Sequence, residues 1–311
     1  MTIGIAAFGP KSGAGVVAGL RAVELVGRGA IGGFVSFAAL TNDGRLLRAS
    51  TQTGGAGSLF DGAVPEEIAL SPLAGLISSG PNRPEPLSEF VAAEPGVGIV
   101  TGHRMPQTPA PDGVPLNLHV LQRMKDGADP QAAIDAVIAR YPDMDAGFVA
   151  FSMDGSIGMG NMPTVMTRGD HGSAILNAPE TKARVASIHN AIHPHRLVAA
   201  AATETALDAM LRPDPPSRWI EISAGAPLCV SEQARVVVDE NGVVEQLCHP
   251  ANIYLSGEWS VGLGDRVAVF AQGKQIGWLG YEPFMKVVNG KLQSIDGKDH
   301  MHLPLLDRVP Y

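Results

Sequence analysis

The sequence predicts an α+β protein in two parts, a helix-and-sheet body over residues 1–212 and a smaller antiparallel β domain over residues 213–311. Helical and strand-like hydrophobic patterns alternate through the body, whereas short strands separated by Gly-containing turns fill the last hundred residues. The segment between them, from Arg212 to Pro216, is rich in proline and cannot continue a helix, so we interpret it as a stiff linker.

Composition restricts the classes of function. The chain is 45% hydrophobic and 17% charged, which is enough apolar material for a folded core. The net charge of -8, without any run of Lys or Arg, disfavours nucleic acid as a partner. No stretch approaches the roughly 18 apolar residues that a membrane-spanning helix needs, and no basic segment opens the chain. We therefore expect a cytoplasmic protein that is neither exported nor embedded in a membrane.

Two cysteines, Cys229 and Cys248, are too few for a disulfide framework or a four-cysteine zinc site. We expect both to be free buried thiols.

The first elements of the body are a strand, a helix and a hairpin. Residues 3–8 predict the strand, and apolar positions between residues 16 and 26 predict the helix. The hairpin turns at Asn42-Asp43-Gly44, because Asp-Gly supplies the positive φ angles of a tight β-turn.

Later elements of the body follow from capping residues and prolines. A strand is predicted over residues 96–101, and Asp129 before Pro130 predicts a helix N-terminus, with Tyr141-Pro142 ending that helix. A second hairpin turns at Asp154-Gly155, and residues 179–191 and 196–211 predict two further helices. In the C-terminal domain, strands are expected on both sides of turns at Asn241-Gly242, Gln272-Gly273 and Asn289-Gly290.

Two stretches carry a resemblance to a known family: GAIGGFVSFAALTNDGRLLRASTQTGG (29–55) and GVPLNLHVLQRMKDGADPQAAIDAVIARYPDMDAGFVAFSMDGSIG (113–158). Their order resembles the N-terminal-nucleophile hydrolases, in particular the branch of plant-type asparaginases and glycosylasparaginases. In that branch a strand that begins with the nucleophile runs into an acidic-Gly turn and returns to a Thr-Gly-Gly element. The resemblance implies a four-layer αββα sandwich over residues 1–212 and says nothing about the remainder.

The nucleophile position of that family is not matched. Those enzymes act through a Thr, Ser or Cys at a new N-terminus, whose free α-amine serves as the base. The corresponding position falls near Phe34 and Val35, and the nearest hydroxyl belongs to Ser36. An uninterrupted chain gives no sign of cleavage before Ser36, and a retained Met1 disfavours Thr2. We expect the scaffold without evident autocleavage.

Candidate chemistry lies where predicted strands end. The segment 51–58 combines hydroxyls with glycines, whose backbone N–H groups could stabilise an oxyanion. His103 and Arg104 are expected on the loop after a strand, as a proton shuttle and a carboxylate clamp, and His171 follows another strand-like run. For each segment the alternative is an ordinary solvated loop.

These residues give the first functional hypothesis, a small-molecule amide-bond hydrolase that needs no cofactor. Ser36 or Thr53 would be the nucleophile and His103 the base. The substrate would contact Thr51, Gly54, Gly55, Arg104 and His171.

Two alternatives remain. The first is a non-catalytic protein on the same scaffold, which binds a small ligand or assembles into a homo-oligomer through the C-terminal domain, with Trp259 and Trp278 as contacts. The second is a metal-dependent hydrolase that uses His189, His193 and His195, although Pro194 interrupts their helical spacing and histidines at a helix end are the simpler interpretation.

Overall fold

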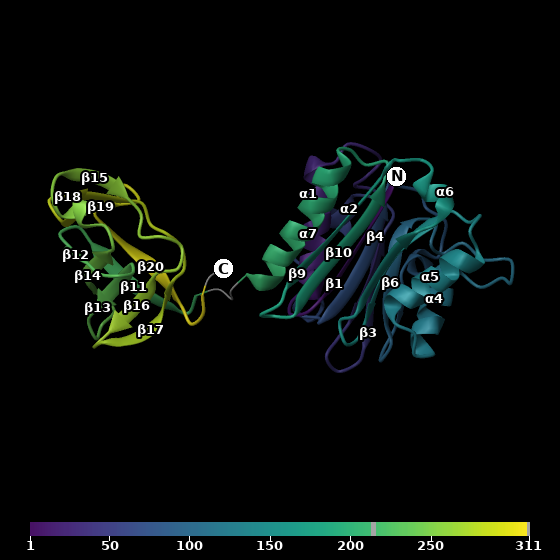
Figure 1. Ribbon diagram of the computed structural model, residues 1–311, viewed down its shortest axis with the longest axis horizontal. Coiled ribbons are helices and arrows are strands. Elements are labelled where there is room, and N and C mark those ends of the chain that lie inside the picture. Colours follow the sequence, from purple (N-terminus) through teal and green to yellow (C-terminus); the bar gives the residue numbers. More distant parts are fainter. Residues whose placement is uncertain (213–215, 310–311) are drawn as a thin grey trace. The chain divides into compact units, whose positions relative to one another are not determined.

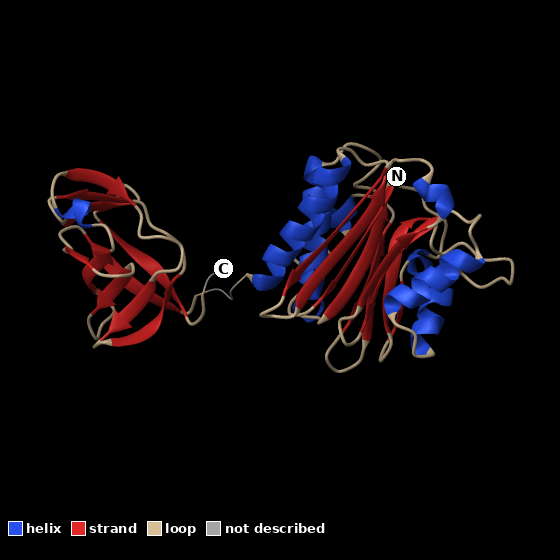
Figure 2. Cartoon of the chain, in the orientation of Figure 1, coloured by secondary structure: helices blue, strands red, loops and turns tan. Residues whose placement is uncertain are grey.

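The computed structural model describes residues 1–212 and 216–309, in two compact units over residues 1–211 and 212–311. The protein is α+β, with most strands antiparallel and with a C-terminal unit built of strands, which confirms the coarse fold class (Figures 1 and 2). Pro213, Asp214 and Pro215 of the expected linker lie outside the described residues. Within the described ranges, no helix combines the length and the apolar character needed to span a membrane.

A six-stranded antiparallel sheet is the centre of the N-terminal unit. Its strand order is β3-β2-β4-β1-β10-β9, so the first strand of the chain is central. Its four inner strands, β2, β4, β1 and β10, are buried on both faces of the sheet. The strands are β1 (Thr2–Phe8), β2 (Val35–Leu40), β3 (Leu46–Thr51), β4 (Leu73–Ser79), β9 (His171–Ala178) and β10 (Ala183–Asn190).

Helices α1 (Ser12–Val26) and α7 (His195–Leu211) cover one face of this sheet and pack against each other (Figure 1). Small residues allow the close contact, since a Cβ atom on Gly19 would lie 2.5 Å from the carbonyl oxygen of Ala202. Ile3 and Ile5 of β1 join the apolar core beneath the two helices. This packing fixes β1 in the middle of the unit.

A four-stranded antiparallel sheet, in the order β5-β6-β7-β8, contacts the other face of the six-stranded sheet. Helices α4 and α5 lie against this smaller sheet (Figure 2). The predicted N-cap is confirmed, because the Asp129 side chain accepts a hydrogen bond from the Gln131 N–H at 2.9 Å. The elements are β5 (Ala92–Glu94), β6 (Gly98–Arg104), β7 (Ala146–Ser152), β8 (Ile157–Asn161), α4 (Leu116–Lys125) and α5 (Pro130–Arg140).

The two sheets share a core and approach closely at one point. Ala6 of β1 and Ile99 of β6 belong to the same buried cluster. A Cβ atom on Gly4 would lie 2.3 Å from the carbonyl oxygen of Gly102, so the backbones of β1 and β6 meet where neither has a side chain. The short helices of this unit are α2 (Gly55–Ser58), α3 (Glu66–Ala69), η1 (Leu87–Phe90) and α6 (Pro163–Met166).

Two expectations for the body were wrong. Residues 179–191 do not form a helix, because Ala183–Asn190 is strand β10, paired with β1 on one side and β9 on the other. Its apolar positions do not alternate, since nearly all of it is buried, and such a run is ambiguous between helix and strand. The strand expected over residues 96–101 extends to Arg104, so His103 lies inside β6 and not on a loop.

The C-terminal unit contains a seven-stranded sheet and a three-stranded sheet. Its expected hairpin turns are confirmed, with positive φ angles at Gly242, Gly273 and Gly290. The expectation of an entirely antiparallel unit was wrong, because β12 pairs parallel with β14 and β13 pairs parallel with β16. The elements are β11 (Arg218–Ser223), β12 (Leu228–Val230), β13 (Arg235–Val238), β14 (Val244–His249), η2 (Asn252–Leu255), β15 (Glu258–Val261), β16 (Ala268–Ala271), β17 (Lys274–Leu279), β18 (Met285–Val288), β19 (Lys291–Ile295) and β20 (His300–Leu306).

The expectation of free thiols was also wrong. Cys229 and Cys248 form a disulfide. They are partners in the parallel register of β12 and β14, with their Cα atoms 4.5 Å apart, which is within bonding range. Their separation of 19 positions in the sequence gives no sign that these two strands are neighbours.

Candidate functional site

Five strands of the six-stranded sheet bring polar residues to the same end. Thr2 of β1 is paired in register with Ser79 of β4 and with Asn190 of β10, and Asn190 is paired with His171 of β9. Thr51 ends β3 at this same end, because Val35 of β2 is opposite both Thr51 and Ser78. The start of the chain is therefore surrounded by strand ends rather than by solvent alone.

A buried hydrogen-bond network surrounds the Thr2 side chain. The Thr2 hydroxyl donates to the Asn190 side chain at 3.0 Å and accepts from the Arg104 backbone N–H at 2.6 Å. His103 Nδ1 lies 3.2 Å from the same Asn190 oxygen, and His103 Nε2 lies 2.7 Å from the side chain of Asn161. We call Thr2, His103, Asn161, Asn190 and the Arg104 N–H the Thr2 network.

The Thr2 network lies between the two sheets. Thr2 points to the face of β1 that carries Ala6, which packs against the smaller sheet, and both Thr2 and His103 are buried. Burial lowers the pKa of His103 to about 4, so its imidazole is neutral near pH 7. A neutral imidazole has one N–H, and its contacts with Asn161 and Asn190 are both with side-chain oxygens, which only accept, so His103 donates to one of the two asparagines.

Charged groups surround the residue that precedes Thr2. Burial, followed by Arg83 and Arg104, lowers the pKa of the Met1 α-amine, and Asp170 acts against this shift. The Met1 carbonyl accepts a hydrogen bond from the Ser79 hydroxyl at 2.6 Å, and its sulfur accepts one from the Ala30 N–H at 3.1 Å. Met1 is thus seated in polar surroundings at the end of β1.

Several buried polar atoms near Met1 and Thr2 have no hydrogen-bond partner in the described part of the chain. They are Arg83 Nε, Asp170 Oδ1, His171 Nδ1 and Asn190 Nδ2. Buried polar atoms are rarely left unsatisfied, and such a group indicates a place where water or a ligand binds. This end of the sheet therefore contains the buried Thr2 hydroxyl and, around it, polar atoms without hydrogen-bond partners among the described residues.

Arg104 contributes to the site through its backbone. Its guanidinium binds the Asp145 carboxylate through two hydrogen bonds, which engages the group that the sequence assigned to a substrate carboxylate. Its φ of 63° is unusual for a residue other than glycine, and it delivers the N–H to the Thr2 hydroxyl.

The hydroxyl-and-glycine segment lies at the same end but does not join the Thr2 network. Three strand spacings separate β3 from β1, which is about 14 Å. The Thr51 hydroxyl donates to the carbonyl of Thr53 at 2.7 Å, and the Gly55 N–H donates to the carbonyl of Gly33 at 2.8 Å. Gly54 adopts a positive φ of 82° ahead of the short helix α2. The Gly55 amide is thus already engaged.

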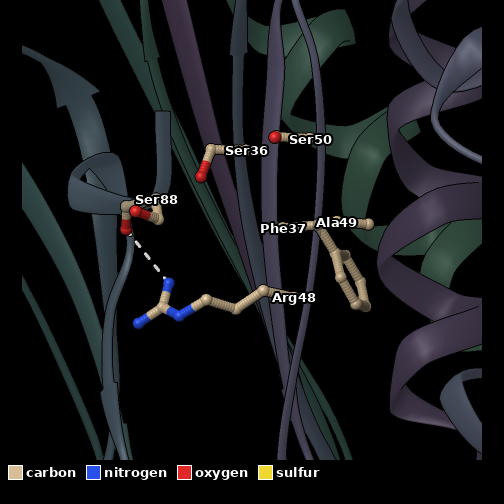
Figure 3. A pocket seen from close by; sticks show the side chains of 6 residues that line it. All are labelled: Ser36, Phe37, Arg48, Ala49, Ser50 and Ser88. Carbon is tan, nitrogen blue, oxygen red and sulfur yellow. Dashed lines mark hydrogen bonds between the residues drawn. The ribbon is translucent and has the colours of Figure 1, made fainter. Parts of the chain in front are cut away.

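Ser36 lines a different pocket, of about 170 Å³, with Arg48, Ser50 and Ser88 among its walls (Figure 3). Ser36 is in register with Ile77 of β4, which is in register with Gly4 of β1. The distance from Ser36 to Thr2 is therefore about 12 Å, from two strand spacings across the sheet and two residues along it. The structure does not bring Ser36 and His103 together.

The three histidines of HNAIHPH (His189, His193 and His195) are not arranged to bind a metal ion. His189 is in β10, and its Nε2 lies 3.0 Å from the backbone oxygen of His195. The rings of His193 and His195 are 4.3 Å apart, and no group of three or more His, Cys, Asp or Glu side chains within residues 1–212 and 216–309 is placed to hold a metal ion.

Sequence reasoning overlooked Asn161, Asn190 and Ser79, and it set Thr2 aside. All four are polar residues at strand ends, and the strands of Thr2, Ser79 and Asn190 are buried. A polar residue that ends an otherwise apolar strand was the available signal, but it does not tell which strand ends meet.

Comparison with known families gives two matches. A family model described as a domain of unknown function (DUF6963) matches residues 2–219. A second model, also described as a domain of unknown function (DUF7259), matches residues 225–300. No curated protein matches the chain.

Proposed function

We propose that this chain, which belongs to the DUF6963 family, is an amide-bond hydrolase of small molecules whose nucleophile is the Thr2 hydroxyl, set free by removal of Met1. The observation that carries the proposal is the Thr2 network, a hydroxyl at the start of the central strand β1 that is held in a buried site by Asn190 and by the Arg104 N–H.

The proposal includes the scaffold that the sequence resemblance implies, an αββα sandwich of the N-terminal-nucleophile type. Two contacting sheets with helices α1 and α7 against one and α4 and α5 against the other support it. So does the position of β1, whose first residue would carry the nucleophile.

The surroundings of Met1 support the chemistry. An α-amine can take a proton from the neighbouring hydroxyl only when it is itself unprotonated, and burial at this end of the sheet lowers the pKa of the Met1 α-amine. The Thr2 oxygen would attack the amide carbonyl carbon while the α-amine takes its proton. That proton would pass to the leaving amine, and water would then hydrolyse the acyl-threonine ester.

Removal of Met1 would also release two hydrogen-bond donors. The Ser79 hydroxyl and the Ala30 N–H now donate to atoms of Met1. Without Met1 they would be available to the oxyanion that forms during the attack. His103 has a different role, as a positioning residue beside Asn190, because burial keeps it neutral and its Nδ1 lies 3.2 Å from the Asn190 oxygen that also accepts from Thr2. Ser36 and Thr53 are not nucleophiles in this mechanism.

Intact-mass measurement and two variants test the proposal. The purified protein should lack the mass of one methionine and should hydrolyse members of a panel of amino-acid and cyclic amides. Thr2→Ala should lower turnover by at least about a thousandfold, whereas Thr2→Ser should retain activity. All three chains have a small second residue, which favours methionine removal, so they differ mainly in the nucleophile. Full activity of Thr2→Ala would refute the mechanism.

A second candidate is a non-catalytic protein that keeps Met1 and binds a small ligand. The two hydrogen bonds that Met1 accepts favour it, because a residue destined for removal needs no such contacts. Retained Met1 together with an absence of turnover would support this candidate. If assembly is also part of its function, residues 1–212 alone should have a lower oligomeric state than the full chain.

A further inference from the structure

We propose that the pocket between β3 and η1, which we call the Ser36 pocket, binds a small oxyanion, either a carboxylate or a phosphate. It is lined by Ser36, Phe37, Arg48, Ala49, Ser50 and Ser88 (Figure 3). This binding site is separate from Thr2 and does not depend on the hydrolase proposal.

Ser36 supplies a buried hydroxyl that forms no hydrogen bond with the described residues. Its side chain is 1% exposed, and its Oγ atom has no hydrogen-bond partner among the described residues. In Figure 3 this hydroxyl points into the space that Arg48 and Ser88 border, on the side away from Phe37. A buried hydroxyl without a partner is unfavourable, so a ligand oxygen that accepts a hydrogen bond from it is favoured.

Arg48 supplies the positive charge. Its Nη1 atom donates to the backbone carbonyls of Ser88 at 3.0 Å and Val91 at 2.9 Å, which hold the guanidinium at the wall of the pocket. Partial burial lowers its pKa, but a guanidinium remains protonated at neutral pH. No carboxylate in the described part of the chain lies within ion-pair distance of Arg48, so its charge is not neutralised by the protein.

Charge and size together define the ligand class. The other lining residues are uncharged, so the pocket carries the single positive charge of Arg48 and the hydroxyls of Ser36, Ser50 and Ser88. A guanidinium beside hydroxyl donors matches the oxygens of a carboxylate or a phosphate. The volume of about 170 Å³ is below the roughly 300 Å³ at which pockets for drug-sized ligands begin, so an anion of a few heavy atoms fits.

Calorimetric titration of the full chain with acetate, and separately with inorganic phosphate, in a buffer without oxyanions tests the proposal. At least one of the two should bind saturably with one site per chain. Arg48→Met and Ser36→Ala should each weaken that binding by about tenfold or more, since each removes a hydrogen bond to a charged group. Ser36→Ala is the cleaner variant, because no hydrogen bond within the protein is lost.

Two matched variants locate the site. Arg45→Met removes a cation from the same hairpin, and Arg83→Met removes one near Met1; neither should change the affinity. Acetate binding alone identifies a carboxylate site, and phosphate binding alone identifies a phosphate site. Absence of saturable binding by both anions, equal binding in Ser36→Ala, or loss only in Arg83→Met would overturn the proposal. These results do not depend on turnover, so they leave the Thr2 mechanism unaffected.

Discussion

The Thr2 network and the Ser36 pocket both lie on the face of the six-stranded sheet that is turned toward the smaller sheet, yet their hydroxyls differ in hydrogen bonding. In the Thr2 network the Thr2 hydroxyl has both an acceptor and a donor within the protein, and His103 lies between two asparagine side chains. In the Ser36 pocket the hydroxyl has neither among the described residues. Polar residues between two sheets can therefore either stabilise the fold or remain available to bind a ligand. The presence or absence of a hydrogen-bond partner within the protein separates these two cases.

The largest difference is expected for replacement of His103. His103→Leu removes the central member of the Thr2 network, so that Asn161 loses its contact and Asn190 keeps only Thr2, and it should lower the free energy of unfolding of the N-terminal unit by about 3 kcal/mol or more. Urea unfolding followed by circular dichroism would measure it. As a control, His119→Leu, which affects a surface contact with Asp112, should cost about 1 kcal/mol or less. Equal losses would contradict the assignment.

The pH dependence of stability tests the same histidine without a mutation. Burial lowers the pKa of His103 from its ordinary 6.5 to about 4, so the unfolded chain takes up a proton more readily than the folded one. Its contribution is therefore complete above pH 6.5 and is lost as the pH falls from 6.5 to about 4. That loss is roughly 3 kcal/mol. Stability measured in this range should fall less steeply for His103→Leu, and an unchanged slope would show that His103 is not the cause.

Burial also lowers the pKa of His189 to about 4, and the hydrogen bond to the His195 backbone acts against this shift. The slope that remains in His103→Leu should therefore belong largely to His189. His189→Asn should reduce it further, measured over the same pH range.

Loss of the Thr2 hydroxyl should have an intermediate effect on stability. Thr2→Val keeps the shape of the side chain but leaves the Arg104 N–H without its acceptor, which should cost about 2 kcal/mol. Thr2→Ser should be within about 1 kcal/mol of the parent chain, because the hydroxyl remains. The comparison is made between chains whose masses show the same N-terminus.

The smallest effect is expected in the Ser36 pocket. Ser36→Ala removes a buried hydroxyl that has no partner, so the free energy of unfolding should stay within about 0.5 kcal/mol or increase. Thermal unfolding in a buffer without oxyanions would check this. A loss above about 1 kcal/mol would mean that the hydroxyl has a partner within the fold, and the contrast between the two sites would disappear.

The sequence was sufficient where local chemistry decides the structure. The hairpin at Asp43-Gly44, the N-cap at Asp129 and the Gly-containing turns of the C-terminal unit follow from backbone preferences of a few residues. It was insufficient for β10, because a strand buried on both faces lacks the alternation that identifies strands.

Prediction of the site failed for a related reason. Its members come from β1, β6, β8 and β10, and their proximity depends on strand order and on the contact between sheets, neither of which leaves a local pattern. The glycine- and histidine-containing segments were predicted to form the site because they were expected in loops, where binding and catalytic residues are common. His103 was among them, but it belongs to a strand, and its partners are amides that no motif identified.

The contact between Gly4 and Gly102 offers a way to adjust the site mechanically. A methyl group at position 4 would collide with the backbone oxygen of Gly102, two residues from Thr2 and two from Arg104. Gly4→Ala would force the two sheets apart at this point and lengthen the hydrogen bond from the Arg104 N–H to the Thr2 hydroxyl. No polar group would be removed. The separation of the Thr2 hydroxyl and the Arg104 N–H thus depends on a contact between two glycine backbones, which a single methyl group would change.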